Sequence, residues 1–293
     1  MKRMLMLFRR ELWEHRALWA FPLAVAVLML LGAVFGRSAL PDGRLPLPPE
    51  ATQAIFAFGV LAFGSVQYVT MSLVLWFYAT DCLYSERKDR SILFWKSMPV
   101  SDAETVLSKA LIAMVVVPLG VFVLTAVTSA IAFGIWSVRL WSGSLPPLLW
   151  NTGAWLRVEG FSLRSLIVAT LWYAPLTSYL MLVSAWARRN VQLWVLLPPI
   201  VAILLEWIAF GTHHLSSLLM YRLVSGWQSS ILVAIERQFV GPALAIGSAG
   251  SAPFVPWRQV GLAFGNIDLW IGLAAAAALL FAATRIRRYR DDT

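Results

Sequence analysis

The sequence has few charged residues and a single cysteine. Charged residues make up 13% of its 293 residues, about half of their share in soluble domains. Cys82 stands alone, which excludes an internal disulfide and a cysteine-rich metal site, and we interpret it as a small buried side chain. The P-loop pattern G-x-x-x-x-G-K-[ST] and the patterns H-E-x-x-H and G-x-S-x-G are also missing. We therefore expect no catalytic residue, no metal and no cofactor bound by this chain itself.

Apolar residues take the place of the missing charges. They make up 59% of the sequence, and the mean hydropathy is +0.72. One compact core cannot hide so much apolar surface, so part of the chain must face lipid. The 15 tryptophans fit this, because Trp favours the membrane–water boundary. The composition predicts an all-α integral membrane protein.

Long apolar runs divide the chain into about six spans within a single transmembrane domain. A membrane-spanning helix needs roughly 20 apolar residues. The candidate spans are 18–35, 55–79, 106–135, 166–186, 191–210 and 267–283. The second and third exceed the bilayer thickness, so we expect them to tilt or to project into the cytoplasm. A long extracytoplasmic loop is predicted at 211–266.

The basic residues predict the orientation of the chain. They concentrate at 2–16, 87–96, 188–189 and 285–290. Cytoplasmic loops of membrane proteins carry an excess of Lys and Arg, so both termini and the segment 84–101 are predicted to be cytoplasmic. The net charge of +9 does not indicate a nucleic-acid partner, because the basic residues flank apolar segments and do not form one groove-sized patch.

The residues before the first span have an amphipathic pattern. Apolar residues recur there at near-helical spacing, namely Leu5, Phe8, Leu12 and Trp19. Charged residues such as Arg10 fall on other faces. This pattern predicts that 1–17 form a helix in the plane of the cytoplasmic leaflet, where its basic residues meet anionic lipid head groups. A straight extension of the first span into the cytoplasm is the alternative.

The segment SERKDRSILFWKSMPVS (85–101) interrupts the apolar runs with a dense group of charges. Pro99 ends the preceding helix, and Ser101 with Glu104 forms the S-x-x-E pattern of a capping box. Its centre is apolar and consists of Ile92, Leu93, Phe94 and Trp95. An exposed apolar patch of this kind predicts a docking surface. Folding of these side chains back onto the head groups is the alternative.

A family resemblance rests on the run from Glu86 to Lys109, which reads ERKDRSILFWKSMPVSDAETVLSK. This run resembles the segment between spans two and three of ABC-2 type transporter permeases. Those proteins typically carry Glu, then an Arg or Gly with Ser/Thr and Leu, then Pro-Val-Ser and a later Lys. The N-terminal FRRELWEHR is similar to their opening in-plane helix. The chain departs from many relatives at Arg90 to Leu93, where they have Gly-Thr-Leu-Glu.

The resemblance implies that 84–101 contains the coupling helix of an ABC transporter. In that family this helix docks into a groove of a separate ATP-binding subunit, which binds ATP and Mg. Leu93, Phe94 and Trp95 are the expected anchors. The remaining docking candidates are Glu86, Arg87, Arg90, Ser91, Ile92, Lys96, Pro99 and Ser101. The charged residues among them, including Glu86, Arg87, Arg90 and Lys96, would set the orientation of docking by charge pairing.

The resemblance also implies partners and a location. The chain is expected to pair with a second copy of itself and with two ATP-binding subunits in the inner membrane of a bacterium. It would export an amphipathic drug, a peptide or a lipid-linked molecule. A non-exporting subunit that drives an extracytoplasmic maturation or sensing process is the first alternative.

Glu206 is the most notable acid within a predicted span. Ionisable residues inside spans are costly and are functional candidates. Because Glu206 lies near the outer end of its span, a role in the transport path and a structural partner role stay equally open. An intramembrane enzyme that uses polar residues near the outer face, such as Glu206, His213 and His214, is the second alternative function.

Overall fold

The computed structural model describes residues 2–36, 49–89, 101–141, 152–225 and 264–289. Regular secondary structure within these ranges is helical throughout, which confirms the predicted all-α class. The α-helices of the first half are α1 (Lys2–Glu14), α2 (Ala17–Phe35), α3 (Pro49–Asp81), α4 (Tyr84–Lys88), α6 (Asp102–Leu111) and α7 (Val117–Trp141). Those of the second half are α8 (Thr152–Trp172), α9 (Ala174–Trp186), α10 (Val191–Phe210), α11 (His214–Met220) and α15 (Ile267–Tyr289). Short π-helical turns follow α6 (Ile112–Val116) and α11 (Tyr221–Ser225).

Five helical segments are long and apolar enough to cross a membrane. They are Ala17–Phe35, Phe56–Lys88, Asp102–Val138, Val191–Phe210 and Ile267–Tyr289. Helices α8 and α9 together form a sixth candidate that bends by 48°. The bend follows from Pro175 in the first turn of α9, because proline lacks the N–H that would continue the helix. The chain thus has the character of a multi-pass membrane protein.

The fourth candidate span begins earlier than the sequence predicts. Its first helix starts at Thr152 and not at residue 166. Glu159 and Arg164 interrupt the apolar pattern there. Both side chains are nevertheless buried. Packing against other helices overrides the local polarity, which a hydropathy pattern cannot show.

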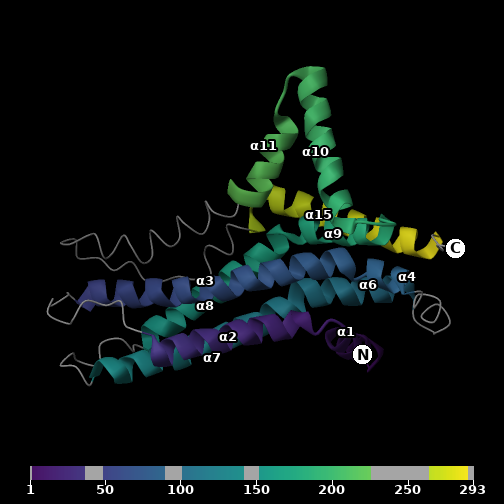
Figure 1. Cartoon of the computed structure of the whole chain (residues 1–293). Coiled ribbons are helices and arrows are strands. Elements are labelled where there is room, and N and C mark those ends of the chain that lie inside the picture. The colour runs from purple at the N-terminus through teal and green to yellow at the C-terminus, as the bar shows by residue number, and fades with distance from the viewer. Residues whose placement is uncertain (1, 37–48, 90–100, 142–151, 226–263, 290–293) are drawn as a thin grey trace.

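The long helices lie side by side, and α3 takes the central position (Figure 1). It contacts α2, α7, α8 and α9, while α15 packs along α9 and α2 packs along α7. α10 and α11 stand away from this bundle (Figure 1). Both ends of the chain lie at the end of the bundle that also carries α4 and the start of α6 (Figure 1).

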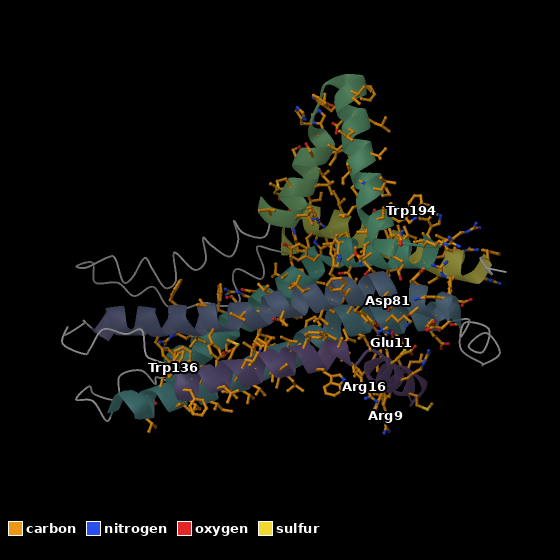
Figure 2. The ribbon with its side chains drawn as sticks, viewed as in Figure 1. Arg9, Glu11, Arg16, Asp81, Trp136 and Trp194 are labelled. Atoms are coloured by element: carbon orange, nitrogen blue, oxygen red, sulfur yellow. The ribbon has the colours of Figure 1, made fainter. Side chains whose placement is uncertain are left out.

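The core of the bundle consists of two apolar clusters. The larger one includes Tyr78 and Cys82, and the smaller one contains Phe56 and Phe133. Cys82 is fully buried, as predicted. Figure 2 shows Glu11 and Asp81 near the end with α4, and Trp136 of the smaller cluster toward the opposite end.

The capping box predicted at Ser101 is present. The Ser101 hydroxyl accepts the N–H of Glu104 at 3.1 Å, and the Glu104 carboxylate accepts the N–H of Ser101 at 2.9 Å. These bonds satisfy two backbone donors at the start of α6. They fix the start of α6 at Ser101, directly after the segment 90–100, which lies outside the described residues.

Helix α11 and the turn after it occupy the start of the predicted loop 211–266. The guanidinium of Arg222 lies 4.2 Å from the centre of the Trp172 ring and donates to the Asp268 carbonyl at 3.1 Å. Gly272 leaves room for it, because a Cβ at this position would collide with Arg222 Nη2. This contact ties the turn to α8 and α15.

Candidate functional site

A buried ion network joins four helices at the end of the bundle that carries α4. Glu11, Glu86, Lys109 and Arg287 are each 4% exposed or less. Lys109 Nζ lies 2.6 Å from Glu11 Oε1 and 3.2 Å from Glu86 Oε1. Arg287 donates to the other oxygen of Glu86 and, through Nε, to Asp102 at 3.0 Å. The network therefore connects α1, α4, α6 and α15.

Each charge in this network has at least one opposite partner. Asp102 adds a third acid beside Glu11 and Glu86, and Arg10 adds a third base beside Lys109 and Arg287, with its Nη2 3.5 Å from Glu86 Oε1. Buried charges are tolerated when they are paired and hydrogen-bonded. Removal of Lys109 would leave Glu11 and Glu86 without their shared base.

Glu11 is ionised because of its neighbours. Burial alone would raise the pKa of its carboxyl, but the His15 imidazole and the charge and hydrogen bond of Lys109 lower this pKa to about 2. The Tyr78 hydroxyl also donates to Glu11 at 3.1 Å, and the ring of His15 meets the ring of Tyr78 edge-on. The inner face of α1 is thus fixed to α3 and α6.

Arg87 points into the chain as well. Its guanidinium donates to the carbonyls of Ser184 and Ala187, each at 2.7 Å, at the end of α9. The Ser184 hydroxyl accepts the N–H groups of Leu83 and Tyr84 at 3.1 Å and 3.0 Å. These bonds pin α4 to the last turn of α9, where unpaired carbonyls favour a cation.

The structure thus describes three of the predicted docking residues. Glu86 and Arg87 are engaged inside the chain, and Ser101 caps α6. The other docking candidates lie outside the described residues, namely Arg90, Ser91, Ile92, Leu93, Phe94, Trp95, Lys96 and Pro99. The segment that contains them therefore starts and ends at fixed points, at α4 and at Ser101.

Glu206 binds the first turn of α11. Its Oε1 accepts the N–H of His214 at 2.7 Å and the hydroxyl of Thr212 at 2.8 Å, and its Oε2 accepts the N–H of Leu215 at 2.8 Å. A carboxylate at this position satisfies free backbone donors and interacts favourably with the helix dipole. Of the two roles left open for Glu206, these contacts support the structural one.

A second buried polar group, which we call the polar layer, lies between the two apolar clusters. It consists of Gln67, Tyr68, Thr125, Ser129 and Glu159, from α3, α7 and α8. Ser129 donates to Glu159 Oε1 at 3.0 Å and accepts the indole N–H of Trp155 at 3.1 Å. Glu159 Oε2 and both amide atoms of Gln67 are buried and have no hydrogen-bond partner among the described residues.

Glu11, Lys109, Arg287 and Glu159 were not predicted as members of these polar groups, and Glu86 was predicted only as a docking residue. Glu11 lies on the same helical face as Phe8 and Leu12, so a charge on an apolar face was the available signal. Lys109 was named only as the last residue of the run 86–109, which resembles the permease family. Nothing in the local sequence around Arg287 distinguishes it from the neighbouring basic residues, because its partners come from distant parts of the chain.

No group of three metal-ligating residues occurs within the described ranges. Comparisons of the chain with family models, with curated proteins and with solved structures found no match. The geometry of this chain and the resemblance of the run 86–109 are therefore the basis for inferring its function.

Proposed function

We propose that this chain is the membrane-spanning subunit of an ATP-driven ABC transporter of the ABC-2 type. The observation that carries the proposal is the ion network at the two ends of the segment 90–100. Glu86 lies just before this segment, and Asp102 and Lys109 lie just after it. Arg287 bonds to both sides, through Glu86 and Asp102. A segment held at both ends in this way is suited to transmit a mechanical displacement.

The long helices supply the next step of the coupling mechanism. α4 follows α3 after two residues, and α6 continues through a π-helical turn into α7. α3 and α7 pack against each other. A force on 90–100 would therefore reach two adjacent long helices, and α1 and α15 would move with them through the network. ATP and Mg would be bound by a separate subunit, which docks on Leu93, Phe94 and Trp95.

The proposal includes the placement of the chain in a bacterial inner membrane. The end of the bundle with α4, α6 and both chain ends would be cytoplasmic, in agreement with the basic residues at these positions. α1 would lie in the plane of the cytoplasmic leaflet. Its inner face is held to α3 and α6 through Glu11, while its outer face exposes Leu5, Met6 and Trp13. This amphipathic exposure supports the placement.

The direction and the cargo follow from the family resemblance alone. A dimer of this chain with two ATP-binding subunits would export an amphipathic drug, a peptide or a lipid-linked molecule. The high aromatic content suits an apolar cargo, although Trp at the lipid boundary accounts for it equally well.

The docking role is tested by replacing Leu93, Phe94 and Trp95 together with Ala. We expect the variant to lose co-purification with the co-expressed ATP-binding subunit and to lose its stimulated ATP turnover, because buried aromatic anchors dominate most interfaces. The matched control is the triple Ala variant of Leu215, Leu218 and Met220, which are exposed on α11. Unchanged assembly and turnover in the first variant would overturn the proposal.

A further inference from the structure

Helix α1 has a second face that the ion network does not use. Its inner face carries Glu11, Phe8 and Leu12, which pack into the bundle. Its outer face exposes Leu5, Met6 and Trp13, each by more than 60%. Such apolar exposure on a short helix is unfavourable in water and suits the boundary of a lipid bilayer.

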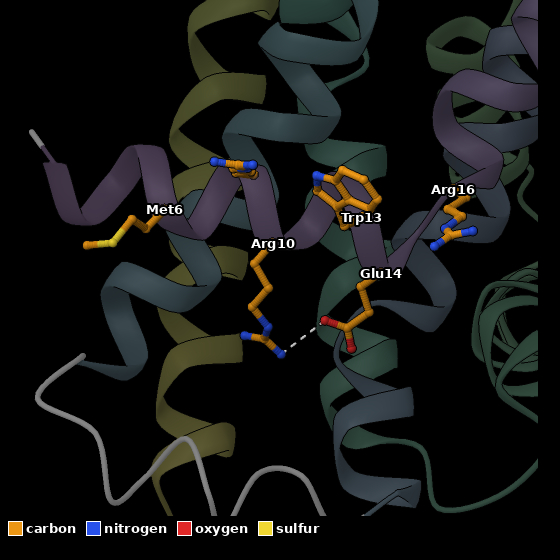
Figure 3. A pocket seen from close by; sticks show the side chains of 6 residues that line it. Met6, Arg10, Trp13, Glu14 and Arg16 are labelled. Carbon is orange, nitrogen blue, oxygen red and sulfur yellow. Dashed lines mark ion pairs between the residues drawn. The ribbon is translucent and has the colours of Figure 1, made fainter.

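The outer face also forms a basic hollow, which is shallow and open to the surroundings. Its volume is about 540 Å³, and it is lined by Met6, Arg9, Arg10, Trp13, Glu14 and Arg16 (Figure 3). Glu14 is paired with Arg10 at 3.1 Å. Arg9 and Arg16 form no ion pair with any described residue, although the guanidinium of Arg16 lies 5.7 Å from the centre of the Trp13 ring. The hollow therefore keeps two uncompensated positive charges beside apolar side chains.

We propose that this hollow binds the phosphate of an anionic lipid head group. Arg9 and Arg16 would contact the phosphate by charge-assisted hydrogen bonds, while Met6 and Trp13 would lie at the level where head groups meet acyl chains. Free phosphate would leave the apolar half of this face unused, and the position of the face directly before the apolar helix α2 favours a membrane over a protein partner. Lipid chemistry matches both halves of the face.

Arg10 connects this lipid site to the ion network. Its guanidinium lies 3.1 Å from Glu14 in the hollow and 3.5 Å from Glu86 in the network. A phosphate bound in the hollow would attract Arg10 and weaken its pairing with Glu86. Because Glu86 lies at the start of the proposed coupling segment, anionic lipid would adjust the rigidity of that segment. By linkage, motion of Glu86 would change the affinity for the lipid by the same factor.

The site is tested with the purified full chain in bilayer nanodiscs of phosphatidylcholine, with and without phosphatidylglycerol. Native mass spectrometry after release from the nanodiscs measures the retained lipid. Replacing Arg9 and Arg16 with Ala should lower the preference for phosphatidylglycerol roughly 25-fold, because each basic residue near an anionic surface contributes about a fivefold factor. The control replaces Arg188 and Arg189, which are exposed at the turn between α9 and α10.

Three results would overturn the lipid site. The first is an equal loss in the control variant, which would indicate a general attraction of charges. The second is the absence of any preference for phosphatidylglycerol in the unmodified chain. The third is displacement of the lipid by millimolar-range inorganic phosphate, which would assign the hollow to the free ion.

The link through Arg10 has its own readout. Hydrogen exchange at the amides of α4 should rise when phosphatidylglycerol is added to the unmodified chain, and should not change in the variant that lacks Arg9 and Arg16. Lipid binding without any change at α4 would overturn the link. This inference rests on the proposed placement of α1 at the cytoplasmic surface. Its tests use no ATP-binding subunit, so failure here and failure of the docking role are distinguished.

Discussion

Glu86 and Glu159 are both buried acids, yet their surroundings differ completely. Glu86 is 1% exposed and contacts Lys109, Arg287 and Arg10. Glu159 is 6% exposed and has a single hydroxyl, that of Ser129, as its hydrogen-bond donor among the described residues. The first region is the ion network, in which every charge has an opposite partner. The second is a layer whose hydrogen bonds are incomplete, so the helices are fixed more firmly at the ion network than at the polar layer.

The largest expected effect is the loss of Lys109. Replacing Lys109 with Met leaves two buried carboxylates, Glu11 and Glu86, without their shared base. Breaking a buried ion pair in this way costs about 3–5 kcal/mol, which should appear as a lower free energy of unfolding in detergent. Lys88→Met is the matched control, because Lys88 is exposed on α4, and it should change stability by less than about 0.5 kcal/mol. Equal losses in both variants would contradict a special role for the network.

Acid should weaken the same ion network. The pKa of Glu11 is lowered from 4.5 to about 2 in the folded chain, so its contribution is complete above pH 4.5 and disappears as the pH falls toward 2. The size is about 3 kcal/mol, since one pKa unit corresponds to about 1.4 kcal/mol. Unfolding measured against pH should show a steeper acid loss for the unmodified chain than for Glu11→Gln. Parallel curves would show that Glu11 is not held by its neighbours.

The smallest expected effect sharpens the contrast between the two acids. Replacing Glu159 with Gln keeps an oxygen that accepts the Ser129 hydroxyl and leaves no cation unpaired, so the stability change should stay within about 1 kcal/mol. Replacing Glu86 with Gln leaves Lys109 and Arg287 in excess and should cost about 3 kcal/mol. Both are measured as free energies of unfolding under the same conditions. A loss at Glu159 that matches the loss at Glu86 would remove the distinction.

Local features of the fold could be predicted from the sequence. The all-α class, the position of most apolar helices and the capping box at Ser101 depend on neighbouring residues, which the chain order displays directly. The start of α8 could not be predicted, because Glu159 and Arg164 interrupt its apolar pattern and their burial depends on other helices. The role of Glu206 in binding α11 was one of two open readings, and only the hydrogen bonds to His214 and Leu215 favour it.

The candidate site was less predictable than the fold. A group of charges such as 86–90 normally indicates a solvated surface, yet Glu86 is buried. Its partner Arg287 is 201 residues away, and Glu11 and Lys109 are 98 residues apart. Charge pairs of this kind have no period or spacing that a single sequence could reveal.

The sequence by itself determined that this chain is helical, suited to lipid and basic at the ends of its apolar segments. These properties follow from composition and short-range periodicity, which do not depend on how the helices meet. The tertiary structure alone decided which charges face one another, because burial removes water and makes an opposite charge the necessary partner. It thereby gathered Glu11, Glu86, Lys109 and Arg287 into one ion network. Glu159, by contrast, has the Ser129 hydroxyl as its hydrogen-bond donor among the described residues.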